Sequence, residues 1–308
     1  MNKTDILSTT LTNVHLKTSV SRGFEAGGRT VIEFPGYEGI KFNVILRGEC
    51  SLSIVGSRQK YHFKTGDCFL MTQGKPFSIG RDLSSKRKVN ALTVLSKNSE
   101  GTASFNGGED FLLTGALFTF EGPFAKVVLE KLPPVIHIPE NLDQALVLRW
   151  GLERFHSEYL NQRPGRSVIL NHLAPIMLLQ IFRVYLQIEK KESNWITALE
   201  DANLMKVIES MHTDFGKNWS LESLAKLAGM SRSGFALKFK NQVGFSPLDY
   251  LTRYRMQIAC ELLEKREKKI AEISQIVGYE SESAFSYAFN KIVGHRPGRH
   301  GSIFTPGR

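Results

Sequence analysis

The stretch Leu224-Ala-Lys-Leu-Ala-Gly229 recurs further along the chain as Ile273-Ser-Gln-Ile-Val-Gly278. In each copy, apolar residues three positions apart predict a short helix, and the glycine allows the backbone to turn at positive φ. Two phenylalanines four positions apart then predict a second helix whose apolar face packs back on the first. Each copy therefore predicts a helix-turn-helix unit. The matching positions after the turn are Phe235, Phe239, Gly244 and Pro247 in the first copy and Phe285, Phe289, Gly294 and Pro297 in the second.

Two such units in tandem indicate DNA binding more strongly than a single helical hairpin would. Residues Gly229–Met256 resemble the first half of the AraC-type DNA-binding domain, and residues Gly278–Pro297 resemble its second half. The resemblance covers the C-terminal third of the chain and implies double-stranded DNA and RNA polymerase as partners. A long helix predicted from Pro247 to about Glu264 would join the units rigidly, so that they enter successive major grooves.

The recognition helices are predicted to show their outward-facing residues to base edges. With the phenylalanines turned inward, Arg232 is placed to bind guanine, Asn290 to bind adenine and Leu237 to meet a thymine methyl group. The alternative for each is an ordinary solvated side chain. The predicted base-reading residues are Arg232, Ser233, Ala236, Leu237, Lys240 and Asn241 in the first unit and Glu282, Ser283, Ser286, Tyr287 and Asn290 in the second.

Other basic residues are predicted to contact DNA phosphates, which position the protein without specifying sequence. Relatives of the AraC type commonly carry arginine where this chain has Leu237 and Tyr287. Apolar contacts and DNA shape are therefore expected to contribute to specificity. The predicted phosphate contacts are Lys238, Arg253, Arg255, Lys291, Arg296 and Arg299.

The N-terminal half carries short β-branched and aromatic runs separated by glycines, which is typical of a barrel or sandwich. Phe42-Asn-Val-Ile-Leu-Arg-Gly48, followed by Gly66-Asp67 and Gln73-Gly-Lys-Pro76, resembles the cupin-type sensor domain that precedes AraC-type DNA-binding domains. The resemblance implies an α+β protein with a cupin-like, effector-binding β-barrel over residues 1–140. The predicted strands are residues 30–34, 41–46, 50–55 and 67–71.

Many cupins are metalloenzymes whose metal needs a His-x-His pair, a glutamate and a later histidine. This chain has no His-x-His pair, Phe77 stands where the later histidine would fall, and His62 is isolated. We therefore expect no metal, no cofactor and no enzymatic activity. A metal-dependent cupin enzyme fused to a DNA-binding module is one alternative. A constitutive DNA-binding protein whose barrel only dimerises is another.

Arg81, Lys86, Arg87 and Lys88 form a basic cluster near the end of the strand-rich region. The cluster predicts a cradle for an anionic small-molecule effector such as a nucleotide or sugar acid, and the alternative is a solvated loop. A cyclic dinucleotide is a minor alternative, because the chain lacks the Arg-x-x-x-Arg pair that a PilZ-like site needs.

The hydrophobic period changes at Asn141, which is placed to cap a helix. A second amphipathic helix is predicted from about Ser167, after the turn Arg163-Pro-Gly-Arg166. The AraC-type resemblance implies that this hairpin, residues 141–190, forms a homodimer interface, and packing on the barrel is an equally strong alternative. The remaining predicted limits are 191–196 for a linker and 197–308 for the all-α DNA-binding domain with its two helix-turn-helix units.

The 308-residue chain has a formal net charge of +10, which favours a polyanionic partner. Its three cysteines form no CxxC pair and predict free thiols in a reducing cytoplasm. No apolar run of membrane-spanning length and no signal-peptide core is evident, so a cytoplasmic protein without membrane contact is expected. The AraC-type and cupin-type resemblance implies a ligand-responsive, sequence-specific transcriptional activator that binds paired promoter sites as a dimer, and these features agree with it.

Overall fold

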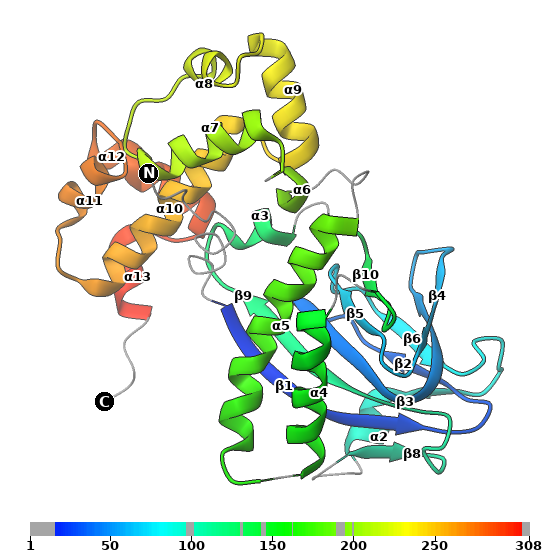
Figure 1. The fold of residues 1–308 in the computed structure, drawn as a ribbon. Helices are drawn as coiled ribbons and strands as arrows, with labels where there is room; N and C mark the ends of the chain where they lie inside the picture. The colour runs from blue at the N-terminus through cyan, green and yellow to red at the C-terminus, as the bar shows by residue number, and fades with distance from the viewer. Residues whose placement is uncertain are drawn as a thin grey trace. The chain divides into compact units, whose positions relative to one another are not determined.

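The computed structural model describes residues 16–96, 102–129, 132–142, 146–161, 163–188, 195–198 and 200–303 (Figure 1). The chain forms two compact units. The first contains residues 17–119 and 133–189, and the second contains residues 120–132 together with residues from 190 onward. Most of the predicted linker, residues 191–194, lies outside the described residues, and residues 195 and 196 begin a short helix.

Strand β3, Ile40–Ile54, lies at the centre of the first unit because four other strands pair with it. Its first half pairs with β5 and β9 and its second half pairs with β4 and β6, all antiparallel. The strand therefore belongs to both sheets of the barrel and joins them (Figure 1). The partners are β4 Lys60–Lys64, β5 Cys68–Met71, β6 Phe77–Gly80 and β9 Phe111–Phe120.

A single bent strand stands where the sequence predicted two, over 41–46 and 50–55. The predicted break was wrong because Gly48 bends β3 instead of ending it. Gly48 has a φ of 76°, and a Cβ there would collide with the carbonyl oxygen of Asp110. A register shift between Ile45 and Arg47 marks the same bend.

The remaining strands complete the two sheets. Strand β2 pairs with β6 and β7, β1 pairs with β8, and β10 pairs with β5. Buried aromatic side chains fill the interior, where the rings of Phe63 and Phe69 stack with centroids 3.8 Å apart. These elements are β1 Leu16–Ala26, β2 Val31–Phe34, β7 Lys88–Asn90, α2 Ala91–Ser96, β8 Ala103–Phe105 and β10 Val135–Ile138.

The three cysteines are free, as predicted, and buried. Burial raises the pKa of the Cys50 and Cys260 thiols to about 12 and also raises that of Cys68. The thiols are therefore held in the neutral form, which is a poor nucleophile.

A helical hairpin of α4, Leu146–Asn161, and α5, Arg166–Ile188, follows β10 and covers one side of the barrel (Figure 1). Phe155 of α4 meets Phe42 of β3 edge to face, with ring centroids 5.9 Å apart. The predicted start of the first helix at Asn141 was too early. Asn141 lies in a turn, and α4 begins at residue 146 after residues 143–145, which lie outside the described part.

Helix α5 is long and apolar enough to cross a membrane by length and composition, with a mean hydropathy of 1.5 over its most apolar window. The sequence-based expectation that no run reaches this length is corrected to that extent. A core helix passes the same test, and α5 turns one face inward. Its buried residues are Leu170, Leu173, Ala174, Met177, Leu178, Ile181, Phe182, Val184 and Tyr185.

The second unit is helical, and its helices begin where the sequence places capping serines. Ser220, Ser231 and Ser246 each accept a backbone hydrogen bond at the start of a helix, as their side chains predict. The helices are α3 Ala125–Leu129, α6 Trp195–Ala198, α7 Ala202–Thr213, α8 Leu221–Leu227, α9 Arg232–Val243, α10 Pro247–Lys265, α11 Ile270–Ile276, α12 Glu282–Val293 and α13 Pro297–Ile303.

Residues 120–132 contribute a core side chain to this second unit, although they precede the hairpin in the sequence. The ring of Phe124 is fully buried. Its centroid lies 5.1 Å from that of Tyr250, 5.6 Å from that of Tyr254 and 6.1 Å from that of His212. The core around α7 and α10 is thus completed by a segment distant in sequence.

Candidate DNA interface

Helices α9 and α12 are the second helices of two matching helix-turn-helix units. Ser231 and Ser281 cap them in the same way, each accepting a hydrogen bond of 3.2 Å from the backbone N–H three residues later. The turn glycines before them, Gly229 and Gly278, have φ angles of 66° and 79°, as their predicted role requires. The two units therefore share one local construction.

The phenylalanine pairs point inward in both units. All four rings are fully buried, with centroids 5.7 Å apart for Phe235 and Phe239 and 5.6 Å apart for Phe285 and Phe289. This confirms the predicted inner face of each helix. The opposite face is left to solvent, because residues on a helix separated by about half a turn point in opposite directions.

Most of the predicted base-reading residues lie on that open face. In α9, Arg232, Ser233 and Leu237 are exposed, and so are Lys240 and Asn241, which also make contacts within the protein. Ala236 is half-buried. The exposed members in α12 are Glu282, Ser283, Tyr287 and Asn290, and Ser286 is half-buried.

The exposed faces differ chemically. Arg232 opens α9 with a donor fork that suits guanine, whereas Glu282 opens α12 with an acceptor that suits the amino group of cytosine. Asn290, one helical turn before the end of α12, carries the amide that suits adenine. The two units are therefore built alike, but their exposed faces carry different hydrogen-bonding groups.

Three of the predicted phosphate contacts are held inside the protein. The Lys238 ammonium lies 2.5 Å from the carboxylate of Asp201, which caps α7. Arg255 donates hydrogen bonds of 2.7 Å to the carbonyl oxygens of Phe215 and Lys217. These cations would have to give up their partners before they could bind phosphate.

Arg253 is engaged in a similar way. It lies 3.3 Å from the carboxylate of Asp249 and stacks over the ring of Phe245, 4.6 Å from its centroid. The predicted phosphate contacts that are exposed are Lys291, Arg296 and Arg299. Lys291 lies near the end of α12, Arg296 directly precedes α13 and Arg299 lies in α13. The second helix-turn-helix unit and the helix after it therefore supply the accessible cations of this set.

The basic cluster predicted as an effector cradle lies on the outside of the barrel. Arg81 pairs with Asp110 at 3.1 Å, and Lys88 pairs with Glu33 at 2.8 Å. Arg87 lies over the ring of Phe105, and Lys86 is exposed. Arg81 borders a polar surface hollow, but none of the four lines the cavity inside the barrel.

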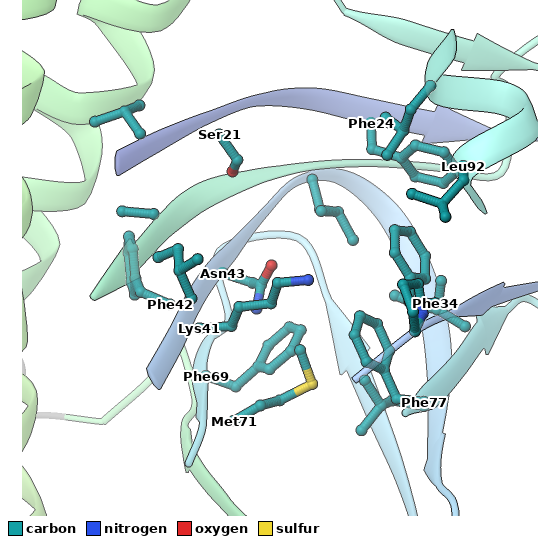
Figure 2. Close-up of a pocket in the computed structure, with 18 residues that line it drawn as sticks. Ser21, Phe24, Phe34, Lys41, Phe42, Asn43, Phe69, Met71, Phe77 and Leu92 are labelled. Carbon is teal, nitrogen blue, oxygen red and sulfur yellow. The ribbon is translucent and has the colours of Figure 1, made fainter. Parts of the chain in front are cut away.

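The cavity inside the barrel has a mainly apolar wall, but it also contains a few polar residues that the sequence analysis did not single out (Figure 2). Lys41 and Asn43 reach into it from β3. Their spacing of two residues along a predicted strand indicated that both side chains lie on the same face of the strand. Whether that face lines the barrel interior depends on how the strands pair, which the sequence did not show.

Many cupin barrels bind a metal ion through clustered histidine and carboxylate side chains. Among the described residues, no group of three or more His, Cys, Asp or Glu side chains is placed to hold a metal ion. His62 lies on the outer face of β4 beside Glu49, at 3.4 Å, and Ser51, at 3.3 Å. Phe77 is part of the cavity wall.

A β-barrel with an internal cavity, followed by two capped helix-turn-helix units, defines a class of regulators that combine a sensor-type domain and a DNA-binding domain in one polypeptide. A family model described as "Cupin" matches residues 5–187, and one described as "Helix-turn-helix domain" matches residues 224–300. The chain belongs to the AraC-type transcriptional regulators that carry an N-terminal cupin domain. This confirms the resemblance predicted from the sequence.

Similar proteins cover nearly the whole chain. Proteins named as AraC-like transcription regulators from Streptomyces lividans and Streptomyces antibioticus are each 32% identical over 96% of this chain and 97% of their own length. The HTH-type transcriptional regulator AlkR from Acinetobacter baylyi is 28% identical over 93% of this chain and 95% of its own.

Among solved structures, ToxT from Vibrio cholerae is 14% identical, with a TM-score of 0.36 over 95% of this chain and 99% of that one. The C-terminal domain of AraT from Geobacillus stearothermophilus is 29% identical, with a TM-score of 0.33 over 35% of this chain and 89% of that one. The relatives are named as transcriptional regulators, and this chain is a DNA-binding transcriptional regulator of the same family.

Proposed function

We propose that this regulator binds paired promoter sites as a homodimer, responds to a small molecule held in its barrel, and activates transcription in the cytoplasm without catalysing a reaction. The observation that carries the proposal is the pair of equivalent recognition helices, α9 and α12, whose outer faces are open while their inner faces are buried. Activation through RNA polymerase and the cytoplasmic setting follow from the AraC-type resemblance.

The two recognition helices are joined by one long helix. Helix α10 has 19 residues and is therefore roughly 28 Å long. Ser246 caps it and Pro247 occupies its first turn, which favours a helix that starts at one defined point. A rigid connector of that length suits two helices that enter successive major grooves about 34 Å apart.

The hairpin supports dimerisation because both of its helices carry large apolar side chains that are exposed to solvent. Trp150 is 62% exposed, and Ile176 is 50% exposed. Contiguous exposed apolar surface on a folded protein commonly marks an interaction site. The exposed apolar residues on the hairpin are Val147, Trp150, Leu160, Val168, Ile169, Ile176 and Ile188.

A symmetric dimer explains this surface economically, because a two-fold interface uses the same patch on both chains. Replacing Trp150 and Ile176 together by glutamate should yield a monomer in sedimentation equilibrium, with the fold retained by circular dichroism. Val55→Glu, at an exposed apolar residue of the barrel, is the control. Dimers that persist in the hairpin variant would place the interface elsewhere.

Ligand response requires the effector to bind one arrangement of the protein better than another. The barrel cavity supports this part of the proposal because it offers a concave, mainly apolar site in which such a molecule would bind. An effector without different affinity for the two arrangements would leave DNA binding unchanged, however tightly it bound.

The DNA-binding part is tested by selecting duplexes from a random pool with the full-length protein and measuring affinity by fluorescence anisotropy. We expect enriched sites with two reading elements one helical turn apart, repeated for the second protomer. Selected duplexes should bind at least about a thousandfold more tightly than scrambled ones at physiological salt. Equal affinity for both would overturn sequence-specific binding.

A further inference from the structure

The cavity inside the barrel has a volume of about 410 Å³ and is walled mainly by aromatic and aliphatic side chains (Figure 2). Small-molecule sites combine an apolar wall with a few placed polar groups. The polar side chains in this lining are those of Lys41, Asn43 and Ser21. Lys41 and Asn43 occupy alternate positions of β3, so the strand presents both on one face.

Asn43 carries a buried donor that lacks a partner. The residue is 8% exposed, and its side-chain amide nitrogen is buried with no hydrogen bond to any described residue. Its backbone neighbours across the sheet are Phe69 on β5 and Gly115 on β9, and the ladder already uses those backbone groups. Buried donors are seldom left unpaired, so this amide indicates an acceptor that occupies the cavity.

Lys41 places an uncompensated charge beside that amide. Its Nζ lies 4.6 Å from the ring centroid of Tyr37, 5.0 Å from that of Phe77 and 5.5 Å from that of Phe34. The rings attract the cation but carry no charge of their own. Burial lowers the pKa of the Lys41 ammonium below its usual value, and no carboxylate of the described residues offsets this effect.

We propose that the cavity is the effector site and takes a small amphiphilic anion, a carboxylate with an apolar or aromatic body. Lys41 and Asn43 bind the head group, and the aromatic walls bind the body. The inference rests on the proposed ligand-responsive function and names its ligand class. A carboxylate fits because it accepts several hydrogen bonds and supplies the missing negative charge.

The same chemistry disfavours other classes. A nucleotide or sugar acid, which the outer basic cluster suggested, would leave hydroxyl groups unpaired against the apolar walls. An amine would place a second cation beside Lys41. A neutral apolar molecule would leave both donors without acceptors.

The test compares three probes that share one apolar body: 4-phenylbutanoate, 4-phenylbutanol and 4-phenylbutylamine. Isothermal titration calorimetry with the full-length protein should show the carboxylate binding at least about tenfold more tightly than the alcohol, and the amine binding weakest. The inference is overturned if the alcohol or the amine binds as tightly as the carboxylate. It is also overturned if none of the three binds at millimolar concentration.

Two variants locate the head group. Lys41→Met keeps an unbranched side chain that is one atom shorter, and Asn43→Leu keeps the approximate volume. Each therefore removes the donor with little change in packing. Both should lose most of the preference for carboxylate over alcohol, whereas Lys88→Met, which removes an exposed lysine on β7, should keep it. Without ligand, Lys41→Met should melt at the same temperature as the parent or higher, because it removes a buried charge. An unchanged preference in Lys41→Met would refute the site.

A parallel measurement separates this inference from the proposed function. Affinity for the selected duplex is measured with and without 4-phenylbutanoate at saturation. Binding of the carboxylate that leaves DNA affinity unchanged would support the site and contradict the coupling. DNA affinity that responds to other compounds, while no probe binds the cavity, would contradict the site and leave the proposed response intact.

Discussion

Leu237 and Tyr287 occupy equivalent positions on the two recognition helices, each two residues after the first buried phenylalanine of its pair. Leu237 is 63% exposed and Tyr287 is 73% exposed, although both side chains are largely apolar. Neither contributes much to the core, so the exposed apolar surface is explained best by what the helices meet outside the protein.

Truncating these side chains should affect DNA reading and not folding. Leu237→Ala and Tyr287→Ala should each lower affinity for the selected duplex by about 1 kcal/mol, through lost contact with a thymine methyl or a neighbouring sugar. Melting temperature should stay the same, because exposed positions contribute within about 0.5 kcal/mol. Val55→Ala, an exposed position in the barrel, is the matched control. Unchanged affinity in both helix variants would remove them from the interface.

Arg232 is expected to specify one base pair. Arg232→Ala should cost about 1–3 kcal/mol on the selected duplex and relax the preference at that position. Affinity is measured on the four duplexes that differ only there. A loss of equal size on scrambled duplex would show that Arg232 contacts the backbone instead.

Arg255 is expected to stabilise the fold, whereas Lys291 is expected to bind DNA, and replacing each by methionine should distinguish the two roles. Arg255→Met leaves the carbonyl groups of Phe215 and Lys217 without their donor, so the unfolding free energy should fall by about 1.5–3 kcal/mol. Lys291→Met should leave stability unchanged but reduce the slope of log affinity against log salt by about 0.9. Salt titrations and urea denaturation of both variants decide the matter. The reverse pattern would exchange the two roles.

His212 should make the helical unit sensitive to acid. Burial lowers its pKa to about 3, and its ring stacks on Tyr254 with centroids 3.9 Å apart. An exposed histidine in the unfolded chain titrates near 6.5, so the folded state binds fewer protons between these values. The contribution of His212 to the unfolding free energy is therefore largest above pH 6.5. The unfolding free energy falls as pH drops towards 3, by up to about 1.4 kcal/mol per pH unit.

The measurement is urea denaturation at pH 7 and pH 5. His212→Phe keeps a ring against Tyr254 but cannot titrate, so its loss between the two pH values should be smaller than that of the parent by about 2 kcal/mol. Carboxylates titrate equally in both proteins and cancel in the comparison. Identical pH dependence would mean that His212 is solvated or protonated in the folded state.

Phe124 should matter to the stability of the DNA-binding unit. Phe124→Ala removes a fully buried ring from among three aromatic neighbours and should destabilise that unit by about 3–5 kcal/mol. Leu248→Ala on α10, where the side chain is 41% exposed, should change stability by less than about 1 kcal/mol. Hydrogen exchange of α7 and α10 amides reports on this unit directly. Protection unchanged by Phe124→Ala would contradict its role in the core.

The sequence predicted the helical unit well because its signals are local. Apolar spacing, turn glycines and capping serines all lie within a few residues of the structure that they determine, as at Ser231 and Gly229. The inward turn of Phe235 and Phe285 followed from the same spacing. Helix periodicity also identified the two helices of the hairpin, although it placed the start of the first one too early.

The remaining features depend on contacts between distant residues. The pairing of β3 with four strands determines that Lys41 and Asn43 face the cavity, and no local pattern fixes that pairing. The ion pair of Lys238 with Asp201 likewise joins separate helices, so spacing alone left Lys238 as a candidate for phosphate. The basic cluster at Arg81 was visible in the sequence, but its acidic partner Asp110 was not.

The place of residues 120–132 has a practical meaning for anyone who shortens this protein. A fragment that begins at residue 190 retains both helix-turn-helix units. It loses Phe124, whose ring packs against the aromatic side chains of α7 and α10. Such a fragment would have an apolar cavity beside His212. Slow folding or aggregation of the fragment would therefore say little about the intact regulator. Supplying residues 120–132 as a separate peptide, or fusing them ahead of residue 190, should restore a stable DNA-binding fragment that does not aggregate.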